Sequence, residues 1–365
     1  MIMAKKIYTT IIGSGSCIPE MKVRNEHFLS YEFYDPSTHR KFDKSNEEII
    51  QKFREIAGIE ERRWVTPDQV TSDIAAIAVS KACESAGIDQ EELDFIIIGH
   101  NFGDIFEGSN CTDVLPGLAN KVKEKLKLKN PGCICMDVIA GCPGWTQGMI
   151  VADSFIKSKL HKRGAVVGAD VLSRISDPHD RDSMIYADGA GAVIVEGRKS
   201  RTPTGILAHS SRSDSVKYAG MLRLGPSFNP AIDRNKLYIK MLGHKLYLYA
   251  ISHVPEIVKD SIEKAGIRLT DIKKVLIHQA NDKMDEAMLK GLFKLYKIHK
   301  IPEDIMPMSI SKLGNSSTAT VPVLYDLIIK GEMNGHSIEK GDYILFISVG
   351  AGMNINSIVY RVPSK

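Results

Sequence analysis

Cys142 stands at a point in the sequence where a nucleophile would be open to substrate. The preceding residues 133–139 are apolar except for Asp137, which is typical of a strand buried on both faces of a sheet. Small or turn-forming residues occupy 140–144, and from Trp145 apolar residues recur at helical spacing. Cys142 is therefore predicted at a tight strand-to-helix corner, where free N–H groups and the helix dipole favour the thiolate. A cysteine that only packs in the core also fits this pattern.

A histidine and an asparagine further along the chain could act together with this cysteine. His278 follows the apolar run 275–277, at the carboxyl end of a predicted strand. Asn315 lies in a loop of small polar residues before a predicted helix, where a helix cap or turn is its ordinary role. The glycine-rich loop 350–352 could aim backbone N–H groups at an oxyanion, although a plain glycine turn also fits.

These three residue types suit two kinds of reaction. In thioester chemistry, the thiolate takes an acyl group and passes it to a second nucleophile. If that nucleophile is a carbanion formed by decarboxylation, a neutral imidazole N–H and an amide N–H can hold the developing enolate. In a cysteine protease, the histidine is instead a base that the asparagine orients.

Length, charge and cysteine content exclude several classes of protein. A chain of 365 residues is long enough for two domains or two fused halves. The net charge of +4 is too small to indicate nucleic-acid binding. Six cysteines in such a chain are no disulfide framework, and the lone Cys133 and Cys135 pair does not predict a metal site. With no signal-peptide core and no membrane-length apolar run, we expect a cytoplasmic protein without a membrane partner.

Alternating helices and buried strands would position the reactive residues. Helices are predicted over 46–56, 71–86, 118–128 and 282–297, and strands over 7–12, 95–98, 165–167 and 193–196. This alternation predicts an α/β fold with mostly parallel sheets covered by helices. The glycine- and serine-rich stretch 13–16 is expected to end the first strand.

The second half of the chain repeats the first. The helix, turn and strand of 86–98 recur in 265–277 at one offset, 265 − 86 = 179 and 275 − 96 = 179. The Gly-Ala-Gly sequence of 189–191 also recurs at 350–352. We therefore predict two related halves, 1–198 and 199–365, packed on a pseudo-twofold axis. The site would lie where both halves contribute loops at strand ends.

Five motifs resemble those of the β-ketoacyl-acyl carrier protein synthase III family of the thiolase superfamily. They are DVIAGC at 137–142, GADVLSR at 168–174, DGAGA at 188–192, IHQAN at 277–281 and GNSSTA at 314–319. They occur in the family's order along almost the whole chain. The resemblance implies a thiolase-like duplicated five-layered αβαβα sandwich, with the nucleophile in the first half and His and Asn in the second. It also implies a homodimer.

The resemblance implies a two-step reaction of fatty acid biosynthesis. An acyltransferase of this type moves an acyl group from acyl-CoA to Cys142, and a decarboxylative Claisen condensation with malonyl-acyl carrier protein follows. His278 and Asn315 would bind the thioester carbonyl and promote decarboxylation. The backbone N–H groups of Cys142 and Gly352 would form a second oxyanion hole. Coenzyme A enters as part of the substrate, and no metal or redox cofactor is implied.

The same resemblance assigns substrate-binding residues. The positions that match coenzyme A or pantetheine contacts are Arg174, Gly243, His244 and Asn281. The family's adenine-stacking tryptophan is missing from the helix before Gly58, where Lys52 and Phe53 are the nearest candidates. His244 stands where asparagine is usual, and Pro143 where a small residue is usual. These departures leave open the starter acyl group and whether its donor is coenzyme A or a carrier protein.

The predicted helix 282–297 carries two stripes. Lys283, Glu286, Lys290, Lys294 and Lys297 lie on one face, and Met284, Met288, Leu292 and Leu295 lie on a second face that should meet the core. The lysine stripe fits a solvated face or a docking site for an acidic partner. Acyl carrier protein is such a partner in the family, and Lys283 and Lys290 are the matching positions.

Other functions remain as alternatives. A thiolase usually carries a second cysteine near its C-terminus, and none follows Cys142 here. A hydroxymethylglutaryl-type synthase needs an acid near the nucleophile, which the sequence does not place clearly. An acyltransferase of a specialised pathway could pass the acyl group to a non-malonyl nucleophile. A non-catalytic partner subunit would usually have lost the cysteine.

Overall fold

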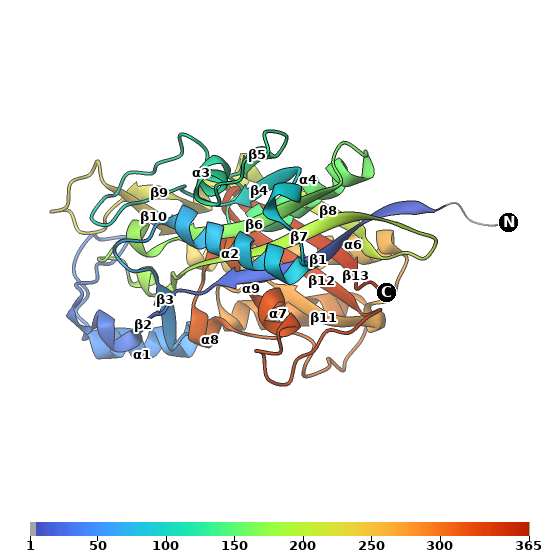
Figure 1. Cartoon of the computed structure of the whole chain (residues 1–365). Coiled ribbons are helices and arrows are strands. Elements are labelled where there is room, and N and C mark those ends of the chain that lie inside the picture. Colours follow the sequence, from blue (N-terminus) through green and yellow to red (C-terminus); the bar gives the residue numbers. More distant parts are fainter. Residues whose placement is uncertain (1–4, 365) are drawn as a thin grey trace.

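Two β-sheets form the centre of the protein in a computed structural model that describes residues 5–364 (Figure 1). The first sheet has the order β1-β7-β6-β4-β5 and the second has the order β11-β12-β13-β8. The first contains β1 (Lys6–Cys17), β4 (Phe95–Gly99), β5 (Ile134–Val138), β6 (Arg163–Val171) and β7 (Asp188–Ser200). The second contains β8 (Gly205–Ser213), β11 (Ile272–Ile277), β12 (Tyr343–Gly350) and β13 (Asn354–Arg361). Two small hairpins pair β2 (Met21–Arg24) with β3 (Glu61–Trp64), and β9 (Leu222–Pro226) with β10 (Leu237–Met241).

The two sheets share one pairing scheme, which confirms the predicted duplication. β6 pairs parallel with β4 and antiparallel with β7, just as β12 pairs parallel with β11 and antiparallel with β13. β4 and β11 contain the strands of the 179-residue repeat. The second match, between the two Gly-Ala-Gly sequences, is not structurally equivalent. Residues 189–191 lie inside β7, whereas Gly350 ends β12 and the next two residues form a turn.

Helices form three layers around the two sheets. The helices are α1 (Asn46–Ala57), α2 (Thr71–Ala86), α3 (Leu118–Lys125), α4 (Gly144–Lys157), α5 (Ser215–Tyr218), α6 (Gly243–Ala265), α7 (Asp282–Leu295), α8 (Ile310–Leu313) and α9 (Thr320–Ile329). α4 and α9 pack between the sheets, α2 and α3 cover the outer face of the first, and α6 and α7 cover that of the second. The layers are thus α, β, α, β, α, as predicted. No helix within 5–364 is long and apolar enough to cross a membrane.

β1 is longer than the sequence predicts. It continues through Gly13 and Gly15 to Cys17, because the glycines let α2 lie directly on the strand. A Cβ atom at Gly13 would lie 2.5 Å from the Ala86 nitrogen, and one at Gly15 would lie 2.5 Å from the Ala78 oxygen. These glycines therefore serve close packing of a helix on a strand, not a turn.

β5, the strand that leads to Cys142, is an edge strand. The prediction of a strand buried on both faces is wrong, because β5 ends the strand order and has β4 alone as its neighbour in the described sheet. Ile134 is 39% exposed and Ile139, just after the strand, is 63% exposed. An apolar run of this kind cannot distinguish a central strand from an edge strand that another surface covers.

A short connection joins the two sheets. β7 ends at Ser200 and β8 begins at Gly205, so residues 201–204 cross from one half to the other. The proposed division after residue 198 falls within the last residues of β7, and it stays a prediction. The start of the N-terminal stretch, residues 1–4, lies outside the described residues.

Candidate active site

The turn between β5 and α4 holds Cys142 at the predicted corner. Pro143 precedes the first helical residue, and its carbonyl accepts hydrogen bonds from the Gln147 N–H at 2.8 Å and the Thr146 hydroxyl at 2.9 Å. The buried Trp145 donates its indole N–H to the Val166 carbonyl at 3.2 Å. These contacts fix the start of α4 on β6 and so fix the backbone of the nucleophile.

Glycines allow the Cys142 turn of the first half to touch the loop 350–352 of the second half. A Cβ atom at Gly350 would lie 2.8 Å from the Cys142 nitrogen, and one at Gly141 would lie 2.6 Å from the Ala351 nitrogen. Gly141 also has a φ of 65°, which favours glycine. The loop 350–352 of the second half therefore packs against the backbone of the nucleophile. The backbone N–H groups of Cys142 and Gly352, which are the predicted donors of an oxyanion hole, would lie at this contact.

Ser317 links the three predicted catalytic residues. Its hydroxyl donates to the Cys142 Sγ at 3.3 Å, and its N–H donates to the Asn315 Oδ1 at 2.8 Å. A backbone hydrogen bond also connects Ser317 with His278. Ser317 was not predicted as a site residue from the sequence, although it lies inside the motif 314–319. Its φ of 52° is unusual for a residue with a side chain and implies backbone strain. Such strain is found where a residue must be held in a functional position, as Ser317 is between these residues.

The structure therefore brings Cys142, His278 and Asn315 together, from β5, β11 and the turn before α9. His278 is 1% exposed and Asn315 is 5% exposed, so both lie away from bulk water. Because the Asn315 Oδ1 is engaged by Ser317, its Nδ2 is left to donate towards a ligand. Their catalytic roles remain predictions.

The buried carboxyl group of Asp170 is connected to Ser317 through the Asn101 amide. The Asn101 amide donates to the Ser317 hydroxyl at 2.8 Å and to the Asp170 Oδ2 at 2.7 Å. The Thr318 hydroxyl donates to the same Asp170 oxygen at 2.9 Å. Burial raises the pKa of Asp170 above its ordinary value, and the hydrogen bonds from Asn101 and Thr318 oppose this. The network sets the direction of the Ser317 hydroxyl.

The resting Cys142 is a thiol, which corrects the expectation of a stabilised thiolate. Burial raises the pKa of Cys142 to about 12, although the Ser317 hydrogen bond lowers it. Asp170 adds a second, smaller upward shift in this pKa. The sequence showed the helix N-terminus, which favours the anion, but not the extent of desolvation. Deprotonation must therefore accompany attack on the substrate.

His278 is a neutral imidazole at physiological pH. Burial lowers the pKa of His278 to about 4, and the backbone hydrogen bond to Ser317 raises it by less. Its Nδ1 is buried and has no hydrogen-bond partner among residues 5–364. A neutral ring suits hydrogen-bond donation to a carbonyl oxygen, as the thioester chemistry requires.

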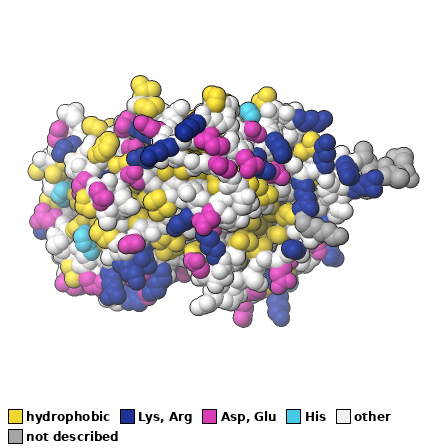
Figure 2. All heavy atoms as spheres, viewed as in Figure 1, with side chains coloured by type: hydrophobic (Ala, Val, Ile, Leu, Met, Phe, Trp, Pro, Cys, Tyr) yellow, Lys and Arg dark blue, Asp and Glu magenta, His cyan; other side chains and the backbone are white. Residues whose placement is uncertain are grey.

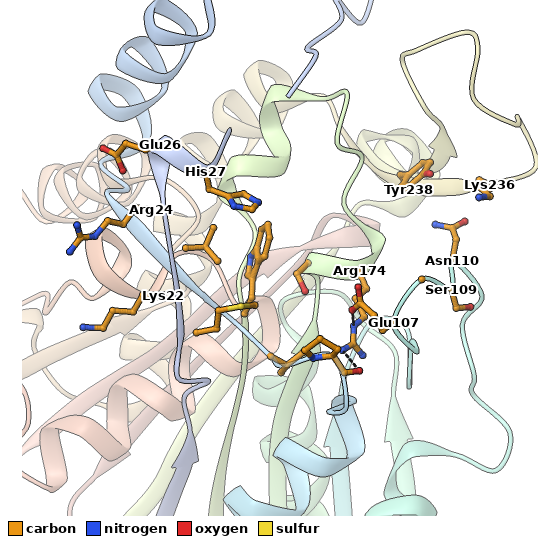
Figure 3. A pocket seen from close by; sticks show the side chains of 17 residues that line it. Lys22, Arg24, Glu26, His27, Glu107, Ser109, Asn110, Arg174, Lys236 and Tyr238 are labelled. Atoms are coloured by element: carbon orange, nitrogen blue, oxygen red, sulfur yellow. Dashed lines mark hydrogen bonds and ion pairs between the residues drawn. The ribbon is translucent and has the colours of Figure 1, made fainter. Parts of the chain in front are cut away.

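The predicted coenzyme A contact Arg174 lines a cavity of about 1080 Å³ (Figure 3). Its guanidinium donates to the carbonyls of Ile105, Thr66 and Pro67, and it lies 3.1 Å from the Glu107 carboxylate. Arg174 is thus committed to holding neighbouring loops. In Figure 3 the labelled side chains of Lys22, Arg24, Glu26 and His27 lie across the cavity from those of Lys236 and Tyr238.

Neither candidate for the missing aromatic residue can stack on a ligand as the structure stands. Lys52 is exposed and pairs with Glu55 at 3.2 Å, and Phe53 packs into two apolar clusters. Aromatic rings that do line the Arg174 cavity include those of Trp64 and Tyr238, and Trp64 lies 64 − 52 = 12 residues beyond the expected position. Trp64 was not predicted from the sequence, because it follows Gly58 and belongs to β3.

The other predicted pantetheine contacts lie at helix starts. Gly243 and the exposed His244 begin α6. Asn281 caps α7, where its Oδ1 accepts the Met284 N–H at 3.1 Å. Their role in binding stays a prediction. Within 5–364, no group of three or more His, Cys, Asp or Glu side chains is placed to hold a metal ion.

α7 has the predicted amphipathic character with one exception. Met284, Met288 and Leu292 are buried in the core, as expected. Leu295 is 44% exposed, because the helix ends there. Lys283 and Lys290 are exposed, and Lys290 pairs with Glu286 at 2.5 Å.

Comparison with known proteins identifies the family. The profiles described as 3-oxoacyl-[acyl-carrier-protein (ACP)] synthase III and its C-terminal part match residues 136–215 and 262–362. The β-ketoacyl-[acyl-carrier-protein] synthase III of Erythrobacter litoralis is 30% identical over 357 residues, which cover 97% of this chain and 99% of the relative. The chain belongs to the β-ketoacyl-[acyl-carrier-protein] synthase III family.

Further members of the synthase III family support the assignment over the whole length. The protein of that name from Xanthomonas euvesicatoria is 31% identical, covering 98% of this chain and all of the relative. The crystal structure of 3-oxoacyl-[acyl-carrier-protein] synthase III from Aquifex aeolicus has a TM-score of 0.77 at 28% identity, and covers 97% of this chain and 99% of that one. The duplicated five-layer architecture is therefore the thiolase-like fold of these synthases.

Replacing Ser317 tests its hydrogen bond to the nucleophile. In Ser317→Ala the pKa of Cys142 should rise further, because the hydroxyl that lowers it is gone. Alkylation of Cys142 by iodoacetamide, followed by peptide mass spectrometry from pH 7 to 10, should slow by about tenfold, as expected for one hydrogen bond to a charged acceptor. Ser316→Ala is the matched control, since the Ser316 hydroxyl contacts Thr320. Equal rates in all three proteins would contradict the role of Ser317.

Proposed function

We propose that this synthase III-like enzyme transfers an acyl group from acyl-CoA to Cys142 and then condenses it with malonyl-acyl carrier protein. The observation that carries the proposal is the meeting of Cys142, His278 and Asn315 around Ser317, in a chain of this family. A nucleophile and two neutral donors in one enclosed site suit thioester exchange followed by decarboxylation.

The first step exchanges one thioester for another. The Cys142 sulfur attacks the acyl carbonyl, the bond to the coenzyme A sulfur breaks, and the thiol proton of Cys142 leaves with coenzyme A as its new thiol. Because burial keeps Cys142 protonated, this proton balance needs no prior ionisation. The N–H groups of Cys142 and Gly352 are the proposed donors to the tetrahedral oxyanion.

The second step forms a carbon–carbon bond. The malonyl carboxylate leaves as carbon dioxide, and the enolate carbon attacks the acyl group on Cys142. The sulfur of Cys142 then leaves and takes up one proton. His278 and Asn315 are the proposed donors to the malonyl thioester oxygen, since both are neutral and buried. Neutral donors stabilise the developing enolate without holding the carboxylate in an ion pair.

The Arg174 cavity supports acyl-CoA as the acyl donor. Besides Arg174, its lining includes the basic side chains of Lys22, Arg24 and Lys236 and the rings of Trp64 and Tyr238. Phosphates and an adenine ring require such cations and aromatic faces. We expect this cavity to receive the nucleotide end of coenzyme A. The rings of Trp64 and Tyr238 would then take the place of the family's usual tryptophan. The chemistry itself requires no metal or redox cofactor.

Free cysteines support a cytoplasmic location. Cys17, Cys83, Cys111, Cys133, Cys135 and Cys142 are all unpaired. Unpaired thiols are typical of reducing compartments, where thioester enzymes with a reactive cysteine also need to work.

Three substitutions test the mechanism. Intact-protein mass spectrometry after mixing with a panel of acyl-CoAs and acyl-carrier proteins should show one acyl mass gain, absent in Cys142→Ala. His278→Ala and Asn315→Ala should still become acylated, because their donors serve the second step. Carbon dioxide release from malonyl-acyl carrier protein should fall by about 100-fold or more in both, as for loss of one oxyanion donor.

The outcomes separate the alternatives. Labelling that survives Cys142→Ala would exclude Cys142 as the nucleophile. A block of acylation in both His278→Ala and Asn315→Ala would make His278 the base for Cys142. A mass gain with acyl-carrier proteins alone would mean that the acyl donor is an acyl-carrier protein and not acyl-CoA. Acylation without carbon dioxide release would indicate a non-malonyl nucleophile, and no gain from any donor would indicate a non-catalytic subunit.

The surface beside the start of α7 supports docking of acyl carrier protein. Figure 2 shows Lys and Arg side chains gathered at the lower left, over the region of α1 and α8 in Figure 1. Lys52 and Arg54 of α1 and Lys312 of α8 are each more than 60% exposed. α1 ends against α7, since a Cβ atom at Gly58 would lie 2.9 Å from Asp282. An acidic carrier would thus meet a basic face that includes Lys283 and Lys290.

Charge reversal tests this docking surface. In Lys283→Glu and Lys290→Glu the KM for malonyl-acyl carrier protein should rise by about tenfold, and the effect should shrink with added salt. Lys199→Glu is the control, because Lys199 lies near the far end of β7, 11 residues from its start beside the site. A KM unchanged by both α7 substitutions would mean that these lysines form only a solvated face.

The exposed edge of the first sheet supports a homodimer. One side of β5 has no strand partner within the described residues, and apolar side chains lie around it. Ile134 is 39% exposed, Ile139 63% and Leu115 86%. A bare apolar edge invites pairing with a second strand, and β5 of another copy would provide it. Such a dimer would also enclose the loop that leads to Cys142.

Light scattering after size-exclusion chromatography tests the dimer. The native protein should have twice the chain mass of 40.4 kDa. Ile139→Asp should shift it towards the single-chain mass, because a charge would be buried at the interface. Leu160→Asp changes an equally exposed residue after α4 and should keep the double mass. A native mass of one chain, or no response to Ile139→Asp, would refute this interface.

A further inference from the structure

The backbone of Tyr186 is paired with that of Asn315. The Asn315 N–H donates to the Ile185 carbonyl at 3.0 Å, and the Ala187 N–H donates to the Asn315 carbonyl at 2.9 Å, which makes a parallel bridge. Directly paired residues of neighbouring extended segments project their side chains to the same face. The Tyr186 ring and the Asn315 amide therefore leave the backbone on the same side. Trp64 fixes this segment by donating its indole N–H to the Tyr186 carbonyl at 3.1 Å.

The Tyr186 hydroxyl is buried and unpaired. The side chain belongs to a residue only 6% exposed, and its oxygen has no hydrogen-bond partner among the described residues. A buried phenol usually finds a partner, because an unsatisfied donor loses its bonds to water without compensation. By contrast, the Ser317 hydroxyl, the Asn101 amide and the Asp170 carboxyl around the reactive residues all have partners.

The bridge to Asn315 places the Tyr186 side chain beside the proposed catalytic residues. Burial raises the pKa of Tyr186 well above its ordinary value, and Asp182, Asp180 and Cys142 add to the shift. The phenol oxygen itself is covered, whereas Cys142 and Asp182 each keep some accessible surface. Tyr186 thus stays protonated and can donate a hydrogen bond to an incoming oxygen.

The proposed reaction has no acceptor for this donor. Each of the two thioester carbonyls already has a pair of donors: the N–H groups of Cys142 and Gly352 for one, and His278 with Asn315 for the other. The malonyl carboxylate is a poor match, because a hydrogen bond to it would stabilise the ground state and oppose its loss as carbon dioxide. A neutral oxygen elsewhere on the acyl chain is the remaining partner.

We propose that the Tyr186 hydroxyl selects acyl thioesters that carry a neutral oxygen, a carbonyl or hydroxyl, near the thioester group. This rests on the proposed acylation of Cys142 and names the class of acyl group that it would take. The paired backbones of Tyr186 and Asn315 and the buried, unpartnered phenol oxygen carry the proposal. A site with such a donor discriminates against the analogue that lacks the acceptor, because the donor is then left unpaired.

The test compares two thioesters of equal chain length. Acetoacetyl-CoA has a carbonyl at the third carbon, where butyryl-CoA has a methylene group. The initial rate of Cys142 acylation is measured by intact-protein mass spectrometry. This rate should be higher with acetoacetyl-CoA than with butyryl-CoA, and the ratio of the two rates should fall about tenfold in Tyr186→Phe. Tyr296→Phe is the matched control, since Tyr296 is another phenol with a buried, unpaired oxygen, at the far end of α7. Its ratio should equal that of the native enzyme.

Two results would overturn the selection by Tyr186. One is an equal ratio in native enzyme and Tyr186→Phe. The other is a fall in carbon dioxide release from malonyl-acyl carrier protein with the ratio unchanged, which would pair Tyr186 with the malonyl group. Thermal denaturation should show no loss of stability in Tyr186→Phe, because the hydroxyl makes no hydrogen bond in the fold.

A binding measurement separates failure of this inference from failure of the proposed acylation. If neither thioester acylates the native enzyme, the acylation step fails. Thermal shifts of Cys142→Ala with each thioester then test selection without reaction. A larger shift with acetoacetyl-CoA, lost in the Cys142→Ala, Tyr186→Phe double variant, would support the role of Tyr186. Equal shifts in both backgrounds would refute it.

Discussion

The active site depends on the close approach of turns from both halves of the chain. A Cβ atom at Gly99 would lie 2.3 Å from the Gly144 carbonyl carbon, one at Gly168 would lie 2.1 Å from the Thr318 oxygen, and one at Gly350 would lie 2.8 Å from the Cys142 nitrogen. None of these contacts could persist with a side chain present. The nucleophile, its donors and the two sheets are thus parts of one packed structure. The site exists only when the two halves are assembled.

The same packing determines the protonation states. Removing water raises the pKa of the Cys142 thiol and the Asp170 carboxyl, and lowers that of the His278 imidazole, so the neutral form is favoured in each case. A chamber of neutral groups suits the thioester group, which is itself neutral. The Ser317 hydroxyl then acts on the sulfur as charge develops, when a hydrogen bond to an anion is strongest.

Elements with strong local signals could be predicted from the sequence. α2 has the predicted bounds of 71–86, because a long apolar pattern ends at Gly87 with a φ of 65°. Cys142, His278 and Asn315 could be predicted because each follows a strand or stands in a motif of small residues. The edge position of β5, the Ser317 connection and the engagement of Arg174 could not. They depend on strand order and on contacts between residues more than 60 positions apart, which no local pattern encodes.

The chamber wall behind Tyr186 depends on a buried ion pair. Lys240 of β10 lies 2.5 Å from the Asp177 carboxylate and 3.1 Å from that of Asp180, which ties the β9–β10 hairpin to the first half. Burial raises the pKa of Asp180 above its ordinary value, and Lys240 opposes this shift. Burial, and then Asp180, raise the pKa of Asp182 to about 7. Asp182 is therefore largely neutral below that pH and increasingly charged above it. This part of the wall therefore becomes more negative as the pH rises through neutrality.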